Sequence, residues 1–175
     1  MYFERITDSQ HPMYAAAIAL YQKGFPLHEQ REALSQERIL RHPDYHFTLS
    51  YDKKVFVGLV LYWETETFLY VEHFCILPEL RNRHYGQHIL TELSKQGKAI
   101  ILEIDLPVDE ISVRRKGFYE RCGFAENPYP HVHPPYHKGN HGHALVVMSC
   151  PEKITPEEYA AFDMYLRGET MRDVF

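Results

Sequence analysis

The sequence lacks the segments that mark membrane-spanning and secreted proteins. No apolar run approaches the roughly 20 residues that cross a bilayer, and the first residues lack the basic and apolar regions of a signal peptide. The three cysteines, Cys75, Cys122 and Cys150, are scattered and odd in number. Because this pattern fits neither a disulfide framework nor a Cys-x-x-Cys zinc site, we expect a cytoplasmic protein.

Several other classes are disfavoured by what is missing. The chain contains no Gly-x-Ser-x-Gly, Walker-type or dinucleotide-binding pattern. Its net charge of −5 argues against general nucleic-acid binding, which depends on a broad basic surface. With 175 residues, 45% of them hydrophobic and 25% charged, and with no repeat or linker, the chain suits one globular domain over residues 1–175.

Apolar runs, turn residues and helix caps alternate in an order that predicts a mixed sheet covered by helices, an α/β or α+β fold. Strands are expected at residues 45–51, 55–63, 68–77, 99–104 and 143–150, with another starting at Phe124. Helices are expected from Asp8 or Ser9 to Gly24, at 29–40, after Tyr85, at 109–122 and at 156–166. The first three strands would form an antiparallel meander.

One strand–turn–helix junction carries most of the functional information. The strand 68–77 stops at Pro78, and a basic turn with Arg81 and Arg83 leads into a helix. Unpaired N–H groups and the dipole at a helix N-terminus favour anions. The junction is therefore predicted to bind phosphate or pyrophosphate; the alternative is an ordinary turn with two solvated arginines.

The pattern Pro-x-x-Arg-x-x-His-x-Gly at residues 78–86 resembles the pyrophosphate loop of the GNAT superfamily of acyl-CoA-dependent N-acetyltransferases, Arg/Gln-x-x-Gly-x-Gly/Ala. Arg81 fills its first position and Gly86 its last, whereas His84 replaces the usual first glycine. Because the left-handed backbone region costs histidine more than glycine, weaker cofactor binding or a reshaped loop is expected. Residues 112–124 resemble the family's later helix, which ends in Phe/Leu-Tyr-x-x-x-Gly-Phe.

The resemblance implies a single-domain GNAT-like fold. Its central sheet would be mixed and mostly antiparallel, with middle strands that splay apart to admit acyl-CoA and with helices on both faces. Backbone groups of Phe74, Cys75 and Ile76 would hold the pantetheine arm, and Ser112 stands where the family often has an asparagine that touches it. The pyrophosphate would bind beside Arg81 to the amides of Asn82, Arg83, His84, Tyr85, Gly86 and Gln87.

The resemblance also suggests an acid and a base. Tyr119 occupies the position of a tyrosine that protonates the departing CoA thiolate, and a pKa of ~10 keeps it protonated at neutral pH. The alternative for Tyr119 is packing beside Phe118 and Phe124. Glu72 matches a glutamate that takes the acceptor's proton, directly or through water, and strand alternation places it on the face of Phe74.

Glu103, on the next strand, is the rival base. A carboxylate inside an apolar strand is costly unless it is paired, so either glutamate could instead pair with an arginine in the sheet. Glu72 is the favoured candidate, and the choice between them stays open.

The most unusual segment is 128–143, which has five histidines and four prolines. One hypothesis is a zinc site built from His131 and His133 with His141 and His143. We favour a loop over the acceptor site, opposite a wall at residues 24–26. No cysteine joins the histidines, proline limits their convergence, and acetyl transfer needs no metal.

The sequence therefore predicts an enzyme that transfers an acetyl group from acetyl-CoA to a primary amine by direct attack in a ternary complex. A small-molecule amine is favoured over a protein lysine or N-terminus, because aromatic-rich loops suggest an enclosed pocket. The competing hypothesis is a non-catalytic module that binds acyl-CoA, or a metal through its histidines. Neither nucleic acid nor membrane is an expected partner, and monomer and homodimer both stay open.

Overall fold

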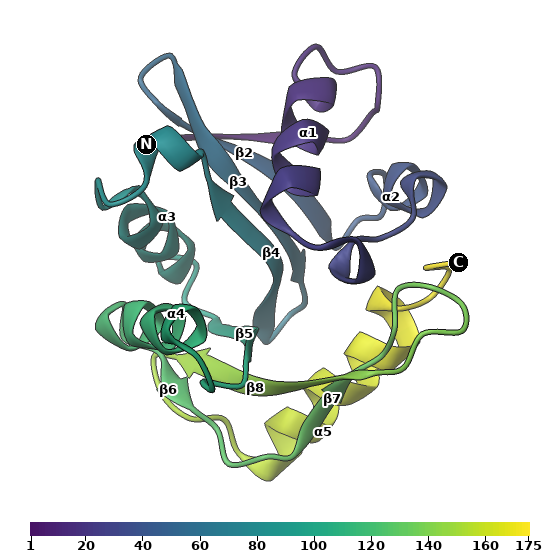
Figure 1. Ribbon diagram of the computed structural model, residues 1–175, viewed down its shortest axis with the longest axis vertical. Coiled ribbons are helices and arrows are strands. Elements are labelled where there is room, and N and C mark those ends of the chain that lie inside the picture. Colours follow the sequence, from purple (N-terminus) through teal and green to yellow (C-terminus); the bar gives the residue numbers. More distant parts are fainter.

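The computed structural model describes residues 1–175 and contains one eight-stranded sheet (Figure 1). Its strands are β1 (Tyr2–Ile6), β2 (Tyr45–Asp52), β3 (Val55–Glu64), β4 (Phe68–Ile76), β5 (Ala99–Asp105), β6 (Ala125–Glu126), β7 (His131–His133) and β8 (His143–Cys150). Its helices are α1 (Tyr14–Gly24), α2 (Ala33–Ile39), α3 (Tyr85–Ser94), α4 (Glu110–Arg121) and α5 (Pro156–Tyr165). Short helical turns are η1 (Leu27–Glu29), η2 (Pro78–Leu80) and η3 (Leu166–Thr170).

The sheet splays between its two middle strands. The strand order is β1-β2-β3-β4-β5-β8-β6, and β7 also pairs with β8. All neighbours are antiparallel except β4 and β5, which run parallel and pair only where residues 68–71 face 99–102. Beyond that point the two strands diverge, as Figure 1 shows. The predicted mixed, mostly antiparallel and splayed sheet is confirmed.

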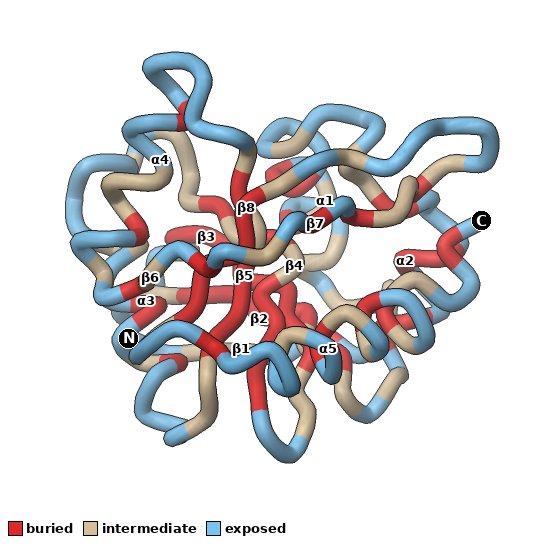
Figure 2. The backbone as a smooth tube through the Cα atoms, turned by 90° about the horizontal axis from the view of Figure 1, so that it is seen from below, coloured by how far each residue is buried: buried red, intermediate tan, exposed pale blue.

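Apolar side chains on the two faces of the sheet form two cores. One contains residues of α1, α2 and α5, and the other contains residues of α3 and α4. Phe162 and Tyr21 are nearly inaccessible in the first, as is Ile89 in the second. Figure 2 shows the buried stretches concentrated in the strands at the centre. Burial of such a side chain stabilises the fold by about 1.5–3 kcal/mol, so both helical layers are held to the sheet.

Two helix starts follow from local sequence. Thr155 accepts a hydrogen bond from the N–H of Glu158, whose side chain accepts one from Thr155 N–H, and Pro156 occupies the first helical position of α5. Asp109 caps α4 in the same way with Ser112. These reciprocal bonds satisfy N–H groups that a helix leaves unpaired, and they fix where both helices begin.

The N-terminal region differs from the expectation. Residues 2–6 form an edge strand that was not predicted, and α1 begins at Tyr14 rather than at Asp8 or Ser9. Only Ile6 of β1 is buried, so the strand carries little apolar alternation. The expected helix over 29–40 divides into η1 and α2, and the strand from Phe124 shortens to β6. None of the helices is long and apolar enough to pass through a lipid bilayer.

Candidate active site

A cleft of about 1430 Å³ opens where β4 and β5 part. β4 and the N-terminus of α3 line one wall, whereas β5 and α4 line the other. One end is bounded by η1 and by parts of the segment 133–145. The volume exceeds the roughly 300–1,000 Å³ of an ordinary small-molecule pocket, so the cleft has room for a long ligand together with a smaller one.

The turn between β4 and α3 carries unpaired backbone N–H groups beside this cleft. No N–H group of residues 82–87 donates a hydrogen bond within the protein, and the first helical donor is His88, to the carbonyl of His84. Asn82 and His84 adopt left-handed conformations, with φ values of 61° and 63°. Successive free donors and the helix dipole together make a site suited to an anion.

Most residues predicted to bind the cofactor line the cleft. They are Phe74, Cys75, Ile76, Arg81, Asn82, His84, Tyr85, Gly86 and Gln87. Arg83 and Ser112 are not in the lining. Arg83 is exposed, whereas Ser112 is buried and its hydroxyl bonds to Asp109. Helix capping takes up the hydroxyl of Ser112, so its contact with a pantetheine arm stays a prediction.

Gly86 allows the two helices beside the cleft to approach each other. A Cβ atom at this position would lie 3.0 Å from Cζ of Phe118, on α4. Any larger residue would have to displace that ring. The glycine at the end of the turn motif therefore has a packing role as well as a place in the cleft wall.

Tyr119 lies on α4 at the cleft wall and is largely buried. Burial raises the pKa of its hydroxyl to about 12. The hydroxyl makes no hydrogen bond within the protein and is not among the buried atoms that lack a partner, so it is open to the cleft. Tyr119 is thus a protonated donor whose bonding capacity is unused.

Glu72 lies on the opposite face of β4 from Phe74 and Ile76, contrary to the expectation from strand alternation. The register between β3 and β4 shifts between Leu61, which faces His73, and Tyr62, which faces Val71, so Glu72 has no partner on β3. Such a bulge reverses the alternation of side chains beyond it.

The carboxylate of Glu72 is buried and accepts hydrogen bonds from three donors. These are Arg31 Nη2 at 3.1 Å, Trp63 Nε1 at 2.7 Å and the Tyr136 hydroxyl at 2.9 Å. Burial alone would raise the pKa of this carboxyl, but the charge of Arg31, the neighbouring His73 and the donors outweigh it and hold the pKa below its usual value. The Glu72 carboxyl is therefore ionised at neutral pH, and it contacts the cleft through the Tyr136 hydroxyl.

The C-terminal segment holds Arg31 in place. Both Arg31 and Glu72 have side chains only 1% exposed. A guanidinium nitrogen of Arg31 donates to the carbonyl of Thr170 at 2.6 Å, and the Ser35 hydroxyl donates to the carbonyl of Asp173 at 2.6 Å. A buried ion pair needs further hydrogen bonds to offset its loss of solvation. The segment after α5 supplies one acceptor to Arg31, whereas Arg31 Nε has no partner.

Glu103, the rival base, is paired with histidines rather than with an arginine. Its carboxylate accepts from the Tyr70 hydroxyl and bonds to His131 Nε2, and His133 Nε2 lies 3.9 Å away. Burial alone would raise the pKa of the Glu103 carboxyl. His133 and His131 together have the larger, opposite effect, so the pKa lies below its usual value. Tyr136 stacks on His133 at a centroid distance of 4.9 Å, so aromatic rings lie between the two glutamates.

The histidine-rich segment contributes to the cleft in part as expected. Pro134, Tyr136, Asn140, His141 and His143 line it, opposite Gly24 and Phe25. The ring nitrogens of His131 contact Tyr159 and Glu103, and Nδ1 of His133 contacts the carbonyl of Pro134. The hypothesis of a zinc site that joins these two histidines to His141 and His143 is therefore not supported.

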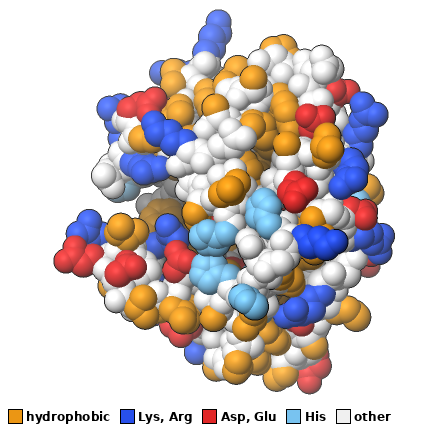
Figure 3. Space-filling view, turned by 45° about the vertical axis from the view of Figure 1, so that its right-hand side comes forward, with side chains coloured by type: hydrophobic (Ala, Val, Ile, Leu, Met, Phe, Trp, Pro, Cys, Tyr) orange, Lys and Arg blue, Asp and Glu red, His pale blue; other side chains and the backbone are white.

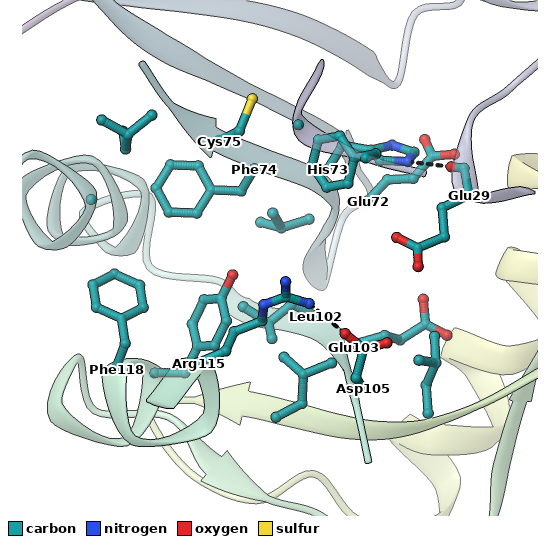
Figure 4. A pocket seen from close by; sticks show the side chains of 18 of the residues that line it. Glu29, Glu72, His73, Phe74, Cys75, Leu102, Glu103, Asp105, Arg115 and Phe118 are labelled. Atoms are coloured by element: carbon teal, nitrogen blue, oxygen red, sulfur yellow. Dashed lines mark hydrogen bonds and ion pairs between the residues drawn. The ribbon is translucent and has the colours of Figure 1, made fainter. Parts of the chain in front are cut away.

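Acidic side chains gather at the same end of the cleft. Figure 4 shows Glu29, Glu103 and Asp105 there, with Phe118 and Cys75 farther along. Arg115 donates to Asp105 at 2.5 Å. Burial and then the charge of Asp105 raise the pKa of Glu29. This end of the cleft thus favours a cation.

Comparison with known proteins identifies the family. The model of the acetyltransferase (GNAT) family matches residues 10–124, which is more than half of the chain. The chain belongs to the GNAT acetyltransferase family. No curated protein sequence matches it significantly.

Solved structures agree with membership of the GNAT family. A protein of Bacteroides thetaiotaomicron assigned to that family has 29% sequence identity, covers 98% of each chain and gives a TM-score of 0.91. An aminoglycoside 6′-N-acetyltransferase in complex with coenzyme A has 14% identity, covers 85% of this chain and 96% of its own, and gives 0.56. The ribosomal-protein-S18-alanine N-acetyltransferase of Escherichia coli has 14% identity. The match covers 89% of this chain and 96% of that protein, with a TM-score of 0.52.

Sequence reasoning on this GNAT protein missed three residues around Glu72. Arg31, Trp63 and Tyr136 come from separate segments and carry no common motif. Only the charge of Glu72 in an apolar strand signalled that a buried partner was needed. Glu29 was missed as well, because it was placed in a helix rather than in the turn η1.

Proposed function

We propose that this protein transfers an acetyl group from acetyl-CoA to a primary amine, by direct attack in a ternary complex. Membership of the family supports acetyl transfer. Coenzyme A in the aminoglycoside 6′-N-acetyltransferase complex supports the choice of donor. The single observation that carries the proposal is the row of unpaired N–H groups at residues 82–87 beside the cleft.

These N–H groups, with Arg81, would bind the pyrophosphate of the donor. The fit is favourable because oriented amides at a helix start neutralise anionic oxygens without rearrangement. The edge of β4 at Phe74, Cys75 and Ile76 is left without a strand partner on the β5 side, since pairing ends at Val71. That edge would hold the pantetheine arm by main-chain hydrogen bonds.

Tyr119 is the proposed acid. As the amine nitrogen bonds to the thioester carbon, the carbon–sulfur bond breaks and the sulfur takes the hydroxyl proton of Tyr119; solvent then restores that proton. The open hydroxyl and its raised pKa of about 12 support this role, because the proton is present at every pH at which the enzyme would work.

Glu72 is the proposed base, acting through Tyr136. The Tyr136 oxygen takes a proton from the ammonium while its own proton passes to Glu72, so that a neutral amine attacks. The 2.9 Å bond from the Tyr136 hydroxyl to Glu72 Oε1, together with the place of Tyr136 in the cleft wall, supports the relay. Glu103 would act in the same sense if its histidine partners, rather than Tyr136, proved essential.

The acceptor is a small cationic amine in this proposal. Glu29, Glu103 and Asp105 would attract an ammonium to the end of the cleft. Residues 133–145 and η1 bound that end, which favours a compact acceptor over a folded protein surface.

A screen of amines by mass spectrometry, with acetyl-CoA as donor, tests the proposal. We expect products that gain one acetyl group, a matching release of CoA, and binding of CoA by calorimetry. A protein with no affinity for CoA would refute the whole scheme. A protein that binds CoA but acetylates no amine would instead support the non-catalytic module.

A further inference from the structure

Three metal-ligating side chains meet at the mouth of the cleft. They are His28 and Glu29 of η1 and His143 at the start of β8, and their ligand atoms all lie within 4.8 Å of one another. His28 Nε2 is 3.6 Å from Glu29 Oε1. In a tetrahedral zinc site, ligand atoms lie about 3.4 Å apart, because each bond is about 2.0–2.2 Å long. Small side-chain rotations would therefore bring the three into coordination.

We propose that His28, Glu29 and His143 form a Zn²⁺ site. Two imidazoles and a carboxylate are ligands that zinc prefers, whereas calcium and magnesium favour all-oxygen sites. Asp105 lies beside His143 but is not one of the three clustered ligands. Its Oδ1 atom lies 3.7 Å from His143 Nε2, while its Oδ2 atom accepts from Arg115.

The ligands are accessible to an ion from solvent. The side chains of His28, Glu29 and His143 are 57%, 29% and 40% exposed. Figure 3 shows histidine side chains gathered on one face beside a hollow. By contrast, the side chains of His131 and His133 are buried and bonded to other groups, so those two histidines are not free to take part.

A bound ion would close the acceptor end of the cleft. All three ligands line the cleft, and they belong to its two opposite sides, η1 and β8. Zinc would tie these sides together and cover the acidic groups that attract a cation. This consequence rests on the proposed function: zinc would compete with the amine and leave CoA binding unchanged, and the reaction itself would not use the metal.

Calorimetric titration of the full, untagged chain with ZnCl₂ tests the site. We expect one ion per chain, and we expect the double variant His28→Ala, His143→Ala to lose affinity by ~100-fold or more. His141→Ala is the matched control, because His141 lines the same cleft outside the cluster; it should bind zinc as the native chain does.

The outcomes separate this inference from the proposed function. Absence of zinc binding, or binding that the double variant retains, would overturn the metal site whatever the enzyme does. One zinc ion lost in the double variant would establish the site even if no amine were acetylated. Melting temperatures of the metal-free variants check the fold, and zinc should raise those of the native chain and of His141→Ala but not that of the double variant.

Discussion

Replacement of Tyr136 by phenylalanine is the most direct test of the acid–base arrangement. The change removes one oxygen, which donates to Glu72 Oε1 at 2.9 Å, and keeps the ring that stacks on His133. Arg31 and Trp63 remain bonded to Glu72. The buried charge is therefore still paired, and the fold should survive. Glu72→Gln is a poorer probe, because it would leave Arg31 buried without its charge partner and cost about 3–5 kcal/mol.

The structure allows separate magnitudes for stability and rate. A hydrogen bond to a charged group contributes about 1.5–3 kcal/mol, and we expect the lower end because Glu72 keeps two donors. That loss corresponds to a fall in melting temperature of about 3–6 °C for a chain of this size. If Tyr136 relays the proton, its loss should lower kcat by about 10²- to 10⁴-fold.

Tyr129→Phe is a matched control for Tyr136→Phe. The Tyr129 hydroxyl donates to the carbonyl of Ile154 at 2.8 Å, in the same segment but outside the cleft. Its loss should cost about 0.5–1.5 kcal/mol of stability and leave kcat unchanged. Steady-state rates, CoA affinity and thermal unfolding would be compared for both variants. Full kcat in Tyr136→Phe would show that the proton does not leave by this route.

Three further predictions concern other parts of the chain. Tyr119→Phe should lower kcat by ~100-fold or more with CoA affinity and melting temperature unchanged, since the hydroxyl has no partner in the protein; full activity would eliminate it as the acid. His84→Gly should relieve about 1–3 kcal/mol of strain from the left-handed backbone conformation. It should therefore raise the melting temperature and tighten CoA binding, whereas His84→Ala should change neither of these two quantities. Burial and then Arg5 lower the pKa of His46 to about 4. Between about pH 6.5 and 4, the unfolded chain therefore binds a proton at His46 that the folded chain does not, and stability falls as pH drops through that window. His46→Phe should flatten this dependence by about 1–2 kcal/mol in urea titrations, after allowance for partial solvent exposure; an unchanged slope would contradict the assignment.

The order of the elements could be read from the sequence because the signals are local. The strand β8 and the helix α5 begin at the residues that the sequence predicted, His143 and Pro156. Apolar continuity marks the first, and a proline after a capping threonine marks the second. The turn at 78–86 could be found for the same reason, since its arginine and glycine are close in sequence.

The surroundings of Glu72 could not be read in this way. A bulge adds one residue to a strand, so the side chains beyond it point to the opposite faces from those that alternation predicts. Nothing in the sequence around Glu72 indicates that a bulge is present. Its partners Arg31, Trp63 and Tyr136 come from a turn, a strand and a loop that only the folded chain brings together. The edge strand β1 was missed because it buries one side chain, Ile6, and so lacks a strong pattern.

The contacts that residues 170–173 make with Arg31 and Ser35 link the end of η3 to the candidate active site, although the two are far apart in the sequence. The carbonyl of Thr170 accepts a hydrogen bond from Arg31, and the carbonyl of Asp173 accepts one from Ser35. Arg31 in turn donates to Glu72 and orients its carboxylate. Without this turn, the Arg31 guanidinium would lie inside the molecule with one acceptor fewer, and it would orient Glu72 less firmly. Residues 170–173 thereby stabilise, through Arg31, the orientation of a carboxylate that lies on a strand far away in the sequence.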